Sequence, residues 1–484
     1  MAEHQTETAP TEDTEPAWSN ARMRLTAVIV ASALFMQSLD STIIATALPA
    51  MARSFHTVPL HMSVALTSYL IALAVFIPAS GWVADRFGAR QVFRAAIVVF
   101  TIGSVLCGIA PSLPVLVGSR VLQGMGGAMM VPVGRLVLMR SISHSQMVSA
   151  MSWLTVPALL GPVIGPPLGG FIVSFATWRW VFDINVPIGI IGTIAVSLYI
   201  QDVREEGQGG RLDAWGLLLS GFAMALLMMA FETTGRDLVP VSWTASAYAA
   251  GFAACALYWR HARRHPHPVI DLTLFAITNF AIPALAGSLF RIAVGALPFL
   301  LPLMLQLDFG FTPLASGLVT FTAAAGAMLM KPAAPPLLAR FGFRNVLVWN
   351  GVFAALAMSL CAAFEKTWPS IVMNLILFAG GFLRSLQFTA FNVIAYGEIP
   401  RARMSAATSL YSTIQQLSLT LGIVVGATTL DIASRLHHHT QATKADYALA
   451  FIVVSFIALL ASPFCARLDR HAGESMSGHH AAEP

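Results

Sequence analysis

An acidic side chain, Asp40, stands deep inside the first long apolar segment of this chain. In FMQSLDSTIIATALP it lies about 15 residues into the segment, or roughly 22 Å along a helix. A carboxylate in such surroundings is costly, and its usual roles are to carry a proton or to pair with a cation. Gln37 shares its helix face by i, i+3 spacing, so we expect both side chains to point into a helical bundle. The alternative is a structural ion pair that never changes protonation.

A basic side chain, Arg120, is the expected partner of this carboxylate. It lies in VLVGSRVLQGMGGAMMVPVGR, with Gln123 three residues later on the same helix face. The two apolar segments run in opposite directions, so Arg120 lies about 9 Å and Asp40 about 15 Å from the same end, a difference that an arginine side chain can bridge. We predict that Asp40 and Arg120 couple a proton to a ligand by exchanging partners. The alternative is that Arg120 only braces helices through backbone carbonyls.

Further polar side chains stand inside apolar segments of the second half of the chain. Arg291 and Arg384 have no carboxylate in their own segments, so a cavity that they line would be cationic and would not select cations alone. Lys331 lies near a segment end, where its side chain is expected to reach the interface. The residues expected to line a substrate cavity are Gln37, Gln123, Arg291, Arg384, Asn392 and Gln415.

The elements that hold these side chains are predicted to be membrane-spanning helices. Hydrophobic residues make up 56% of the 484 residues and charged residues only 11%, against roughly 25% charged in soluble domains. Apolar runs of about 20 residues, enough to cross a bilayer as a helix, recur between short polar breaks. Fourteen such runs are predicted, at 25–50, 62–83, 95–112, 114–139, 147–174, 180–200, 212–231, 243–260, 280–305, 313–336, 345–364, 368–396, 404–430 and 446–466. The fold class is therefore an all-α integral membrane protein.

The basic residues are unevenly divided between the two sides of these predicted spans. The side that holds the N-terminus carries 17 Lys and Arg, the other side carries 6, and 5 of the 28 lie within spans. Because basic loops stay in the cytoplasm, both termini are predicted to be cytoplasmic. The net charge of +5 therefore reflects membrane orientation, and no nucleic-acid partner is expected.

Two stretches repeat each other 254 residues apart, PASGWVADRFGARQVF at 78–93 and PAAPPLLARFGFRNVL at 332–347. Shared positions include Arg86 with Arg340, and Gly88 with Gly342. Parallel halves of this kind are typical of membrane carriers. The predicted order is a cytoplasmic tail (1–24), a six-helix bundle (25–200), linkers with two inserted helices (201–278), a second six-helix bundle (279–468) and a cytoplasmic tail (469–484).

The segment GPVIGPPLGG combines a glycine ladder with prolines. Small residues at intervals of four let helices approach closely, and prolines remove backbone donors and bend the helix. We expect a hinge or a tight seal between the halves, with simple helix packing as the alternative. The residues concerned are Gly161, Pro162, Gly165, Pro166, Gly169 and Gly170.

Several kinds of site are not indicated. No G-K-[ST] phosphate loop occurs, so the chain is not expected to use ATP, and neither H-E-x-x-H nor G-x-S-x-G occurs, so no enzyme is expected. The four cysteines lie in apolar segments without C-x-x-C spacing, which argues against a disulfide or a zinc site. The run His437-His438-His439 is interpreted as a solvated loop, so no metal or cofactor is predicted.

Taken together, these motifs make the chain similar to the major facilitator superfamily. It resembles the fourteen-helix drug:proton antiporter branch, and within that branch the multidrug resistance protein D type. The likeness covers nearly the whole chain after residue 24, including Leu39-Asp40-Ser41-Thr42, Ala47-Leu48-Pro49 and TWRWVFDINVPIGIIG at 177–192. The branch's antiporter motif matches the glycine and proline segment, and its gating-loop motif matches Gly81, Asp85, Arg86, Gly88 and Arg90. Ala89 departs from it, because a basic residue is common there.

The resemblance implies a secondary transporter that exports amphipathic small molecules in exchange for protons by alternating access. Asp85 would latch the cytoplasmic side, and the latch would be one-sided because the repeat has Ala339 at this position. The expected partners are a small-molecule substrate, protons and membrane lipid, and the protein is expected to act as a monomer in the bacterial inner membrane. The alternatives are a proton-coupled carrier of an endogenous, anionic metabolite or chelator, and a non-transporting membrane sensor or scaffold.

Overall fold

The computed structural model describes residues 17–140, 147–200, 213–234, 239–265, 268–400, 403–437, 442–469 and 472–473. All regular structure in these ranges is helical, as the sequence predicts. The first half contains α1 (Ala17–Ile43), α2 (Leu48–Ser54), α3 (Ser63–Phe76), α4 (Ser80–Phe87), α5 (Ala89–Gly108), α6 (Leu113–Arg140), α7 (Met147–Phe175), α8 (Trp180–Asp183) and α9 (Asn185–Tyr199). Then follow α10 (Ala214–Thr233), α11 (Val241–Ala262), α12 (Thr278–Leu303), α13 (Pro313–Asn345), α14 (Gly351–Ser359), α15 (Ser370–Ile394), α16 (Met404–Leu436), α17 (Lys444–Leu459) and α18 (Ala461–Cys465).

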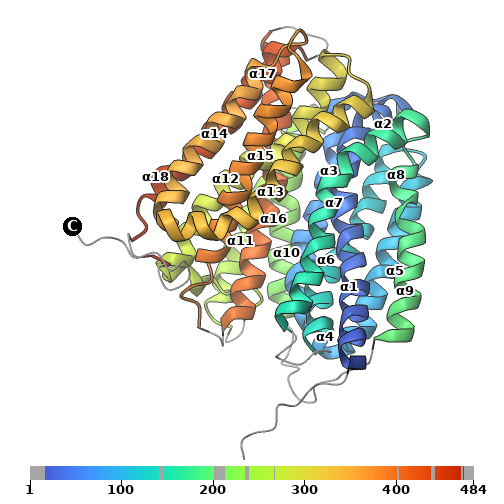
Figure 1. Ribbon diagram of the computed structural model, residues 1–484, viewed down its shortest axis with the longest axis vertical. Helices are drawn as coiled ribbons and strands as arrows, with labels where there is room; N and C mark the ends of the chain where they lie inside the picture. Colours follow the sequence, from blue (N-terminus) through green and yellow to red (C-terminus); the bar gives the residue numbers. More distant parts are fainter. Residues whose placement is uncertain are drawn as a thin grey trace, which may run out of the picture.

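The helices form two bundles side by side, with α1 to α9 in one and α12 to α18 in the other (Figure 1). The bundles meet where α7 packs against α13 and α3 packs against α16. Helices α10 and α11 form a hairpin, and α10 contacts both α3 and α16. Ser63 at the start of α3 donates a hydrogen bond to Glu232 near the end of α10. The hairpin therefore contacts both bundles.

Eleven helical stretches among the described residues are long and apolar enough to cross a membrane. The prediction of a multi-span, all-α membrane protein is therefore confirmed, whereas the number fourteen is not established by this count. One of the eleven, Pro313–Ala363, covers two predicted spans. Its backbone is not helical at Gly342, where φ is 70°.

The repeat seen in the sequence has a structural counterpart at its glycines. Gly88 joins α4 to α5 with φ of 89°, and Gly342 has φ of 70°, both in the left-handed region that favours glycine. The arginine two residues later behaves alike in both copies. Arg90 donates to the carbonyl of Ser197 near the end of α9, and Arg344 Nη2 donates to the carbonyl of Ala466, just after α18, at 2.9 Å. Each copy of the repeat thus contains a glycine turn, followed by an arginine that donates to a backbone carbonyl near the end of the last helix of its half.

Candidate functional site

Asp40 and Arg120 form an ion pair in the interior of the first bundle. Arg120 Nη1 on α6 lies 2.6 Å from Asp40 Oδ2 on α1, and the side chains are 0% and 1% exposed. The structure therefore brings together the two side chains that the sequence places at similar depth. Because both charges are removed from water, each depends on the other for its stability.

The other oxygen of Asp40 is held by two amide side chains. Gln123 Nε2 donates to Asp40 Oδ1 at 2.8 Å, and Asn185 Nδ2 donates to the same atom at 3.0 Å. Both amides also donate to Ser104 Oγ on α5, at 2.7 Å for Gln123 and 3.3 Å for Asn185. Asp40 thus accepts hydrogen bonds from α6 and α9 while lying on α1, so any change in its charge affects three helices.

Arg120 is held from several directions. Its Nε donates to the backbone carbonyl of Ala65 on α3 at 3.0 Å, and its Nη1 also donates to Gln123 Oε1 at 2.6 Å. The guanidinium carbon lies 4.2 Å from the centre of the Tyr69 ring, within the range of a cation–π contact. Arg120 therefore both pairs with the carboxylate and braces α3 through a backbone carbonyl.

A small residue allows α3 and α6 to approach at this point. A Cβ added at Gly124 would stand 2.7 Å from the carbonyl oxygen of Tyr69 and 2.6 Å from the Cβ of Ala72. A backbone atom cannot move away cheaply, so the position requires glycine. The close approach involves the backbone of Tyr69, whose ring contacts the Arg120 guanidinium.

A second buried arginine lies in the other bundle. Arg291 on α12 is fully buried, and its Nη2 donates to the Tyr411 hydroxyl on α16 and to Asn392 Oδ1 on α15, the latter at 3.4 Å. Its guanidinium carbon lies 4.7 Å from the centre of the Tyr411 ring and 5.8 Å from that of Phe388. Within the described part of the chain, its Nε and Nη1 atoms have no hydrogen-bond partner. These two nitrogens can donate hydrogen bonds to an anionic or carbonyl group that comes close to them.

The remaining predicted cavity residues are less closely associated. Arg384 is half-buried, and its Nε donates to the carbonyl of Gly380 one turn earlier at 3.2 Å. Gln415 is half-buried and lies one turn after Tyr411, so it shares that face of α16. Gln37 is half-buried one turn before Asp40. Lys331 is exposed and contacts Thr389 Oγ1 at 3.3 Å.

The predicted gating loop comprises the end of α4 and the start of α5. Gly81 and Arg86 are exposed, and a Cβ at Gly81 would meet no atom of the described residues within 4 Å. The side chain of Asp85 lies outside the described residues, so its predicted latch is not visible. The turn at Gly88 and the contact of Arg90 are the structural features that this motif specifies.

The glycines of the predicted antiporter motif lie on two faces of α7. A Cβ at Gly161 would stand 2.7 Å from the Cβ of Ser38, and Cβ atoms at Gly165 and Gly169 would collide with Thr42 and Ile43, all on α1. The motif thus packs α7 against the part of α1 that flanks Asp40.

The last glycine of the motif faces the other bundle. A Cβ at Gly170 would collide with the carbonyl oxygen of Pro313, and one at Gly317 would collide with that of Pro166. The backbone N–H of Leu314 also donates to Ser174 Oγ at 3.2 Å. These contacts form a seam between α7 and α13, which joins the two bundles through backbone atoms in direct contact.

The fold and these motifs agree with a comparison against known families. The pattern that defines the Major Facilitator Superfamily matches residues 30–423 and 283–480. The chain belongs to the major facilitator superfamily. The family resemblance noted in the sequence is confirmed, and the superfamily places the chain among membrane transporters.

The chain is also similar to individual bacterial proteins along most of its length. It is 38% identical over 435 residues to MdtD of Pectobacterium atrosepticum, provisionally named a multidrug resistance protein, covering 90% of this chain and 93% of that protein. It is 41% identical over 429 residues to MdtD of Serratia proteamaculans, which carries the same name, covering 88% of each chain.

Solved transporter structures share the fold. A peptide transporter of the POT family, described as auto-inhibited, has a TM-score of 0.69 at 16% identity, covering 92% of this chain and 97% of its own. A D-xylose-proton symporter has a TM-score of 0.65 at 14% identity, covering 96% of this chain and 100% of its own. At these identities the likeness concerns the fold alone.

Sequence reasoning missed Ser104, Tyr69 and Asn185 as neighbours of the Asp40 and Arg120 pair. Asn185 lies within TWRWVFDINVPIGIIG, and an asparagine in so apolar a segment was the available signal. Serine and tyrosine side chains commonly face neighbouring helices without a functional role, so the sequence pattern did not distinguish Ser104 and Tyr69 from packing residues. Outside this site, one cluster of side chains able to hold a metal ion occurs among the described residues, where α10 and α11 meet.

Proposed function

We propose that this protein is a secondary transporter that exports amphipathic small molecules or drugs in exchange for protons by alternating access. The observation that carries the proposal is the enclosed Asp40 and Arg120 pair, a carboxylate and a cation in the interior of a membrane carrier. The name of the similar MdtD proteins supports drugs as the substrate class. The protein acts as a monomer and needs no ATP.

The proposed architecture has fourteen spans. Dividing Pro313–Ala363 at Gly342 and adding α7 and α11 to the eleven stretches gives that number. They form two six-helix bundles, with the α10–α11 hairpin inserted between them. The excess of basic residues on the side of the termini favours a cytoplasmic location for both ends. Since the similar proteins are bacterial, the membrane is the bacterial inner membrane.

Protonation of Asp40 is the proposed coupling step. A proton on the carboxyl group would leave Arg120 as a buried cation without its anion, and breaking a buried pair in this way costs about 3–5 kcal/mol. The bundle must therefore rearrange when Asp40 takes up or releases a proton. One charge moving inward releases about 2.3 kcal/mol per 100 mV, enough to export a substrate against a gradient of roughly fifty-fold.

The helix contacts suggest how this change reaches the interface between the bundles. Asp40 lies on α1 between Ser38 and Thr42, both of which pack against the glycine ladder of α7. Helix α7 also carries Gly170, which touches α13 in the opposite bundle. A shift of α1 at Asp40 would therefore move α7 and loosen or tighten the seam. The gating loop, Gly81 to Arg90, would latch the cytoplasmic end through Asp85.

A second candidate is a proton-coupled carrier of an anionic metabolite or chelator. It is favoured by Arg291, which is fully buried and has two nitrogens without a partner in the described residues. A carboxylate or phosphate on a substrate would satisfy these donors. The aromatic rings of Phe388 and Tyr411 would pack against its apolar part.

The test is transport by purified protein in liposomes that hold a trapped pH-sensitive dye. Cationic, neutral and anionic amphipathic compounds are added in turn, and empty liposomes serve as the control. We expect a pH change that depends on the compound added. The charge of the compounds that produce it distinguishes the two candidates, because the second candidate requires anionic compounds. No pH change with any compound, together with measured uptake of a radiolabelled member, would exclude proton coupling.

A further inference from the structure

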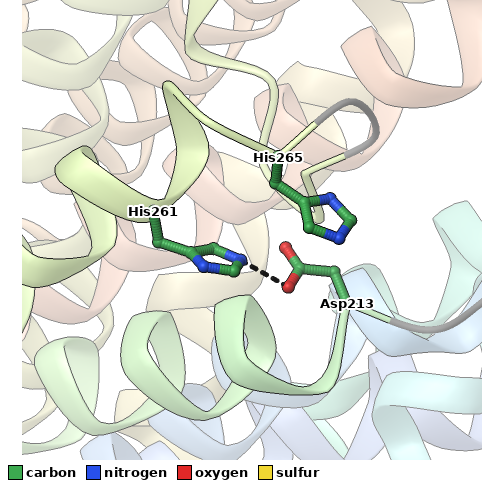
Figure 2. Close-up of side chains that lie close together, drawn as sticks. All are labelled: Asp213, His261 and His265. Atoms are coloured by element: carbon green, nitrogen blue, oxygen red, sulfur yellow. Dashed lines mark hydrogen bonds and ion pairs between the residues drawn. The ribbon is translucent and has the colours of Figure 1, made fainter.

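Three side chains that commonly bind metals converge where α10 begins and α11 ends (Figure 2). Asp213 immediately precedes α10, His261 lies in the last turn of α11, and His265 follows four residues later. One ligand atom from each lies within 4.8 Å of the others. The cluster lies outside the Asp40 site and belongs to the hairpin, for which the proposed transport function assigns no chemistry.

Local structure explains why the carboxylate stands at this place. Asp213 caps α10, and its Oδ1 accepts a hydrogen bond from the backbone N–H of Gly216 at 2.8 Å. Its Oδ2 accepts one from the backbone N–H of Val269 at 3.3 Å. Only 5% of Asp213 is exposed. Backbone donors thus hold the carboxylate at a fixed position, as hydrogen bonds behind a ligand do in metal sites.

The two histidines are arranged by the helical turn between them. The backbone N–H of His265 donates to the carbonyl of His261 at 3.0 Å, so the helical spacing continues past the end of α11. Side chains four residues apart lie on one face, and the two rings stack with their centres 5.2 Å apart. His261 Nε2 lies 2.6 Å from Asp213 Oδ1, and Figure 2 shows the His265 ring beside the same carboxylate.

We propose that Asp213, His261 and His265 bind one divalent transition-metal ion, for which zinc is the best match. Two imidazole nitrogens and one carboxylate oxygen suit zinc and its neighbours, whereas magnesium and calcium prefer oxygen ligands alone. Ligand atoms around tetrahedral zinc lie about 3.4 Å apart, given bonds near 2.1 Å. Rotation of the half-buried histidine rings would lengthen the 2.6 Å distance between His261 and Asp213 and shorten the longer distances to this spacing. Three protein ligands leave one position for water.

A hydrogen bond between His261 and Asp213 that only joins the two helix ends is the competing explanation of the cluster. Such a bond needs only Asp213 and His261, whereas the second imidazole at the i+4 position completes a three-ligand set. Three arginines stand in the same turn, Arg260, Arg263 and Arg264, and they oppose a bound cation. They are all exposed, so water and salt weaken this repulsion. The ion would join α10, α11 and, through Val269, the linker to α12.

The experiment uses the full chain, purified through a tag without histidines and stripped with a chelator. Zinc is titrated in competition with a chromophoric chelator, and cobalt is added separately to record its visible absorption. We expect one zinc ion per chain and the intense bands of four-coordinate cobalt. His265→Gln should lower zinc affinity by about 100-fold or more, since even a change behind the ligands costs 10–100-fold. This variant keeps the Asp213 and His261 hydrogen bond.

The matched control is His437→Gln. His437 Nδ1 also lies 2.6 Å from a carboxylate, that of Asp446, but belongs to a different loop. Its substitution should leave zinc binding and the cobalt spectrum unchanged. Size-exclusion chromatography establishes that both variants are folded. Absence of stoichiometric zinc binding would overturn the proposal, and so would unchanged binding in a folded His265→Gln protein.

Discussion

The Nη1 atom of Arg120 lies 2.6 Å from Oδ2 of Asp40, and neither side chain is open to solvent. The two residues come from helices α1 and α6, and their hydrogen bonds extend to α3 and α9, while Gln123 links the pair to Ser104 on α5. A buried pair of this kind is not in itself strong evidence for stability, because desolvation offsets much of the attraction. We propose a functional role for the pair because it lies inside a membrane carrier.

Removing one partner of this pair should destabilise the protein more than removing both. Arg120→Gln leaves the Asp40 carboxylate buried without its cation, so we expect a loss of about 3–5 kcal/mol in the free energy of unfolding. The double variant Asp40→Asn with Arg120→Gln should recover a large part of this loss. Thermal unfolding of the unaltered protein, both single variants and the double variant in one detergent measures the coupling. Strictly additive effects would show that the two residues do not interact.

The seam between α7 and α13 should not tolerate a methyl group. Gly170→Ala and Gly317→Ala place a Cβ against a backbone carbonyl oxygen, so the bundles must separate by a few tenths of an ångström or more. We expect each change to lower the transport rate and to cost about 1–3 kcal/mol of stability.

The matched control for the seam is Gly118→Ala on α6, where an added Cβ would meet no atom within 4 Å in the part of the chain that the structure describes. Its transport rate should equal that of the unaltered protein, and its melting temperature should be equal or slightly higher, because alanine favours a helix more than glycine does. Equal transport by Gly170→Ala and Gly118→Ala would remove the seam from the mechanism.

Arg291 should determine which substrate charge the protein accepts. Arg291→Gln removes the buried guanidinium, so transport of anionic compounds should fall at least tenfold, while that of cationic compounds should change little. Arg467→Gln removes an exposed positive charge and serves as the control. Uptake of one anionic and one cationic compound is measured in parallel. An equal loss for both compounds would indicate that Arg291 supports the fold and does not select charge.

The ion pair between Asp271 and Arg403 should make a small, pH-dependent contribution to stability. Burial acts to raise the pKa of Asp271, but hydrogen bonds from Thr273 and Arg403 outweigh it and lower the pKa below its ordinary value. A lowered pKa stabilises the folded protein above the ordinary value, and this stability is lost as the pH falls through the folded pKa. Because Arg403 is 36% exposed, the contribution is about 1 kcal/mol or less.

Asp271→Asn tests this contribution by melting temperature. The variant should melt below the unaltered protein at pH 7. The difference should shrink as the pH falls below about 4, the ordinary pKa of an aspartate, and vanish only below the lower pKa of the folded protein. A difference that stays constant down to pH 3 would mean that the pair does not titrate in this range.

The depth of each residue along its apolar segment and the helical spacing of its polar neighbours were sufficient to predict the pairing of Asp40 with Arg120. Both quantities can be read from one helix at a time. The repeat likewise pairs Gly88 with Gly342, and both glycines have a positive φ angle in the structure. Asn185 could not be assigned in this way, since its contact with Asp40 joins residues 145 positions apart. That contact depends on how α9 packs against α1, which no local pattern encodes.

The cluster at the hairpin was missed for a related reason. Asp213 and His261 are separated by 48 residues, and only the antiparallel packing of α10 and α11 brings the two helix ends together. Metal motifs within a short segment were absent, so the sequence predicted no metal. The run of three histidines at His437 was interpreted from the sequence as a solvated loop. In the structure His437 contacts Asp446, while His438 and His439 lie outside the described residues.

Proton movement by Asp40→Asn in liposomes tests the central claim most directly. The amide keeps the size of the side chain and a hydrogen-bond acceptor for Arg120, but it cannot carry a proton. Asp431→Asn makes the same chemical change at a helical ion pair with Arg435 and serves as the control. The account predicts that Asp40→Asn abolishes substrate-coupled pH change in a protein that is less stable but still folded, while the control keeps normal coupling. Full coupling in the Asp40→Asn protein would contradict it.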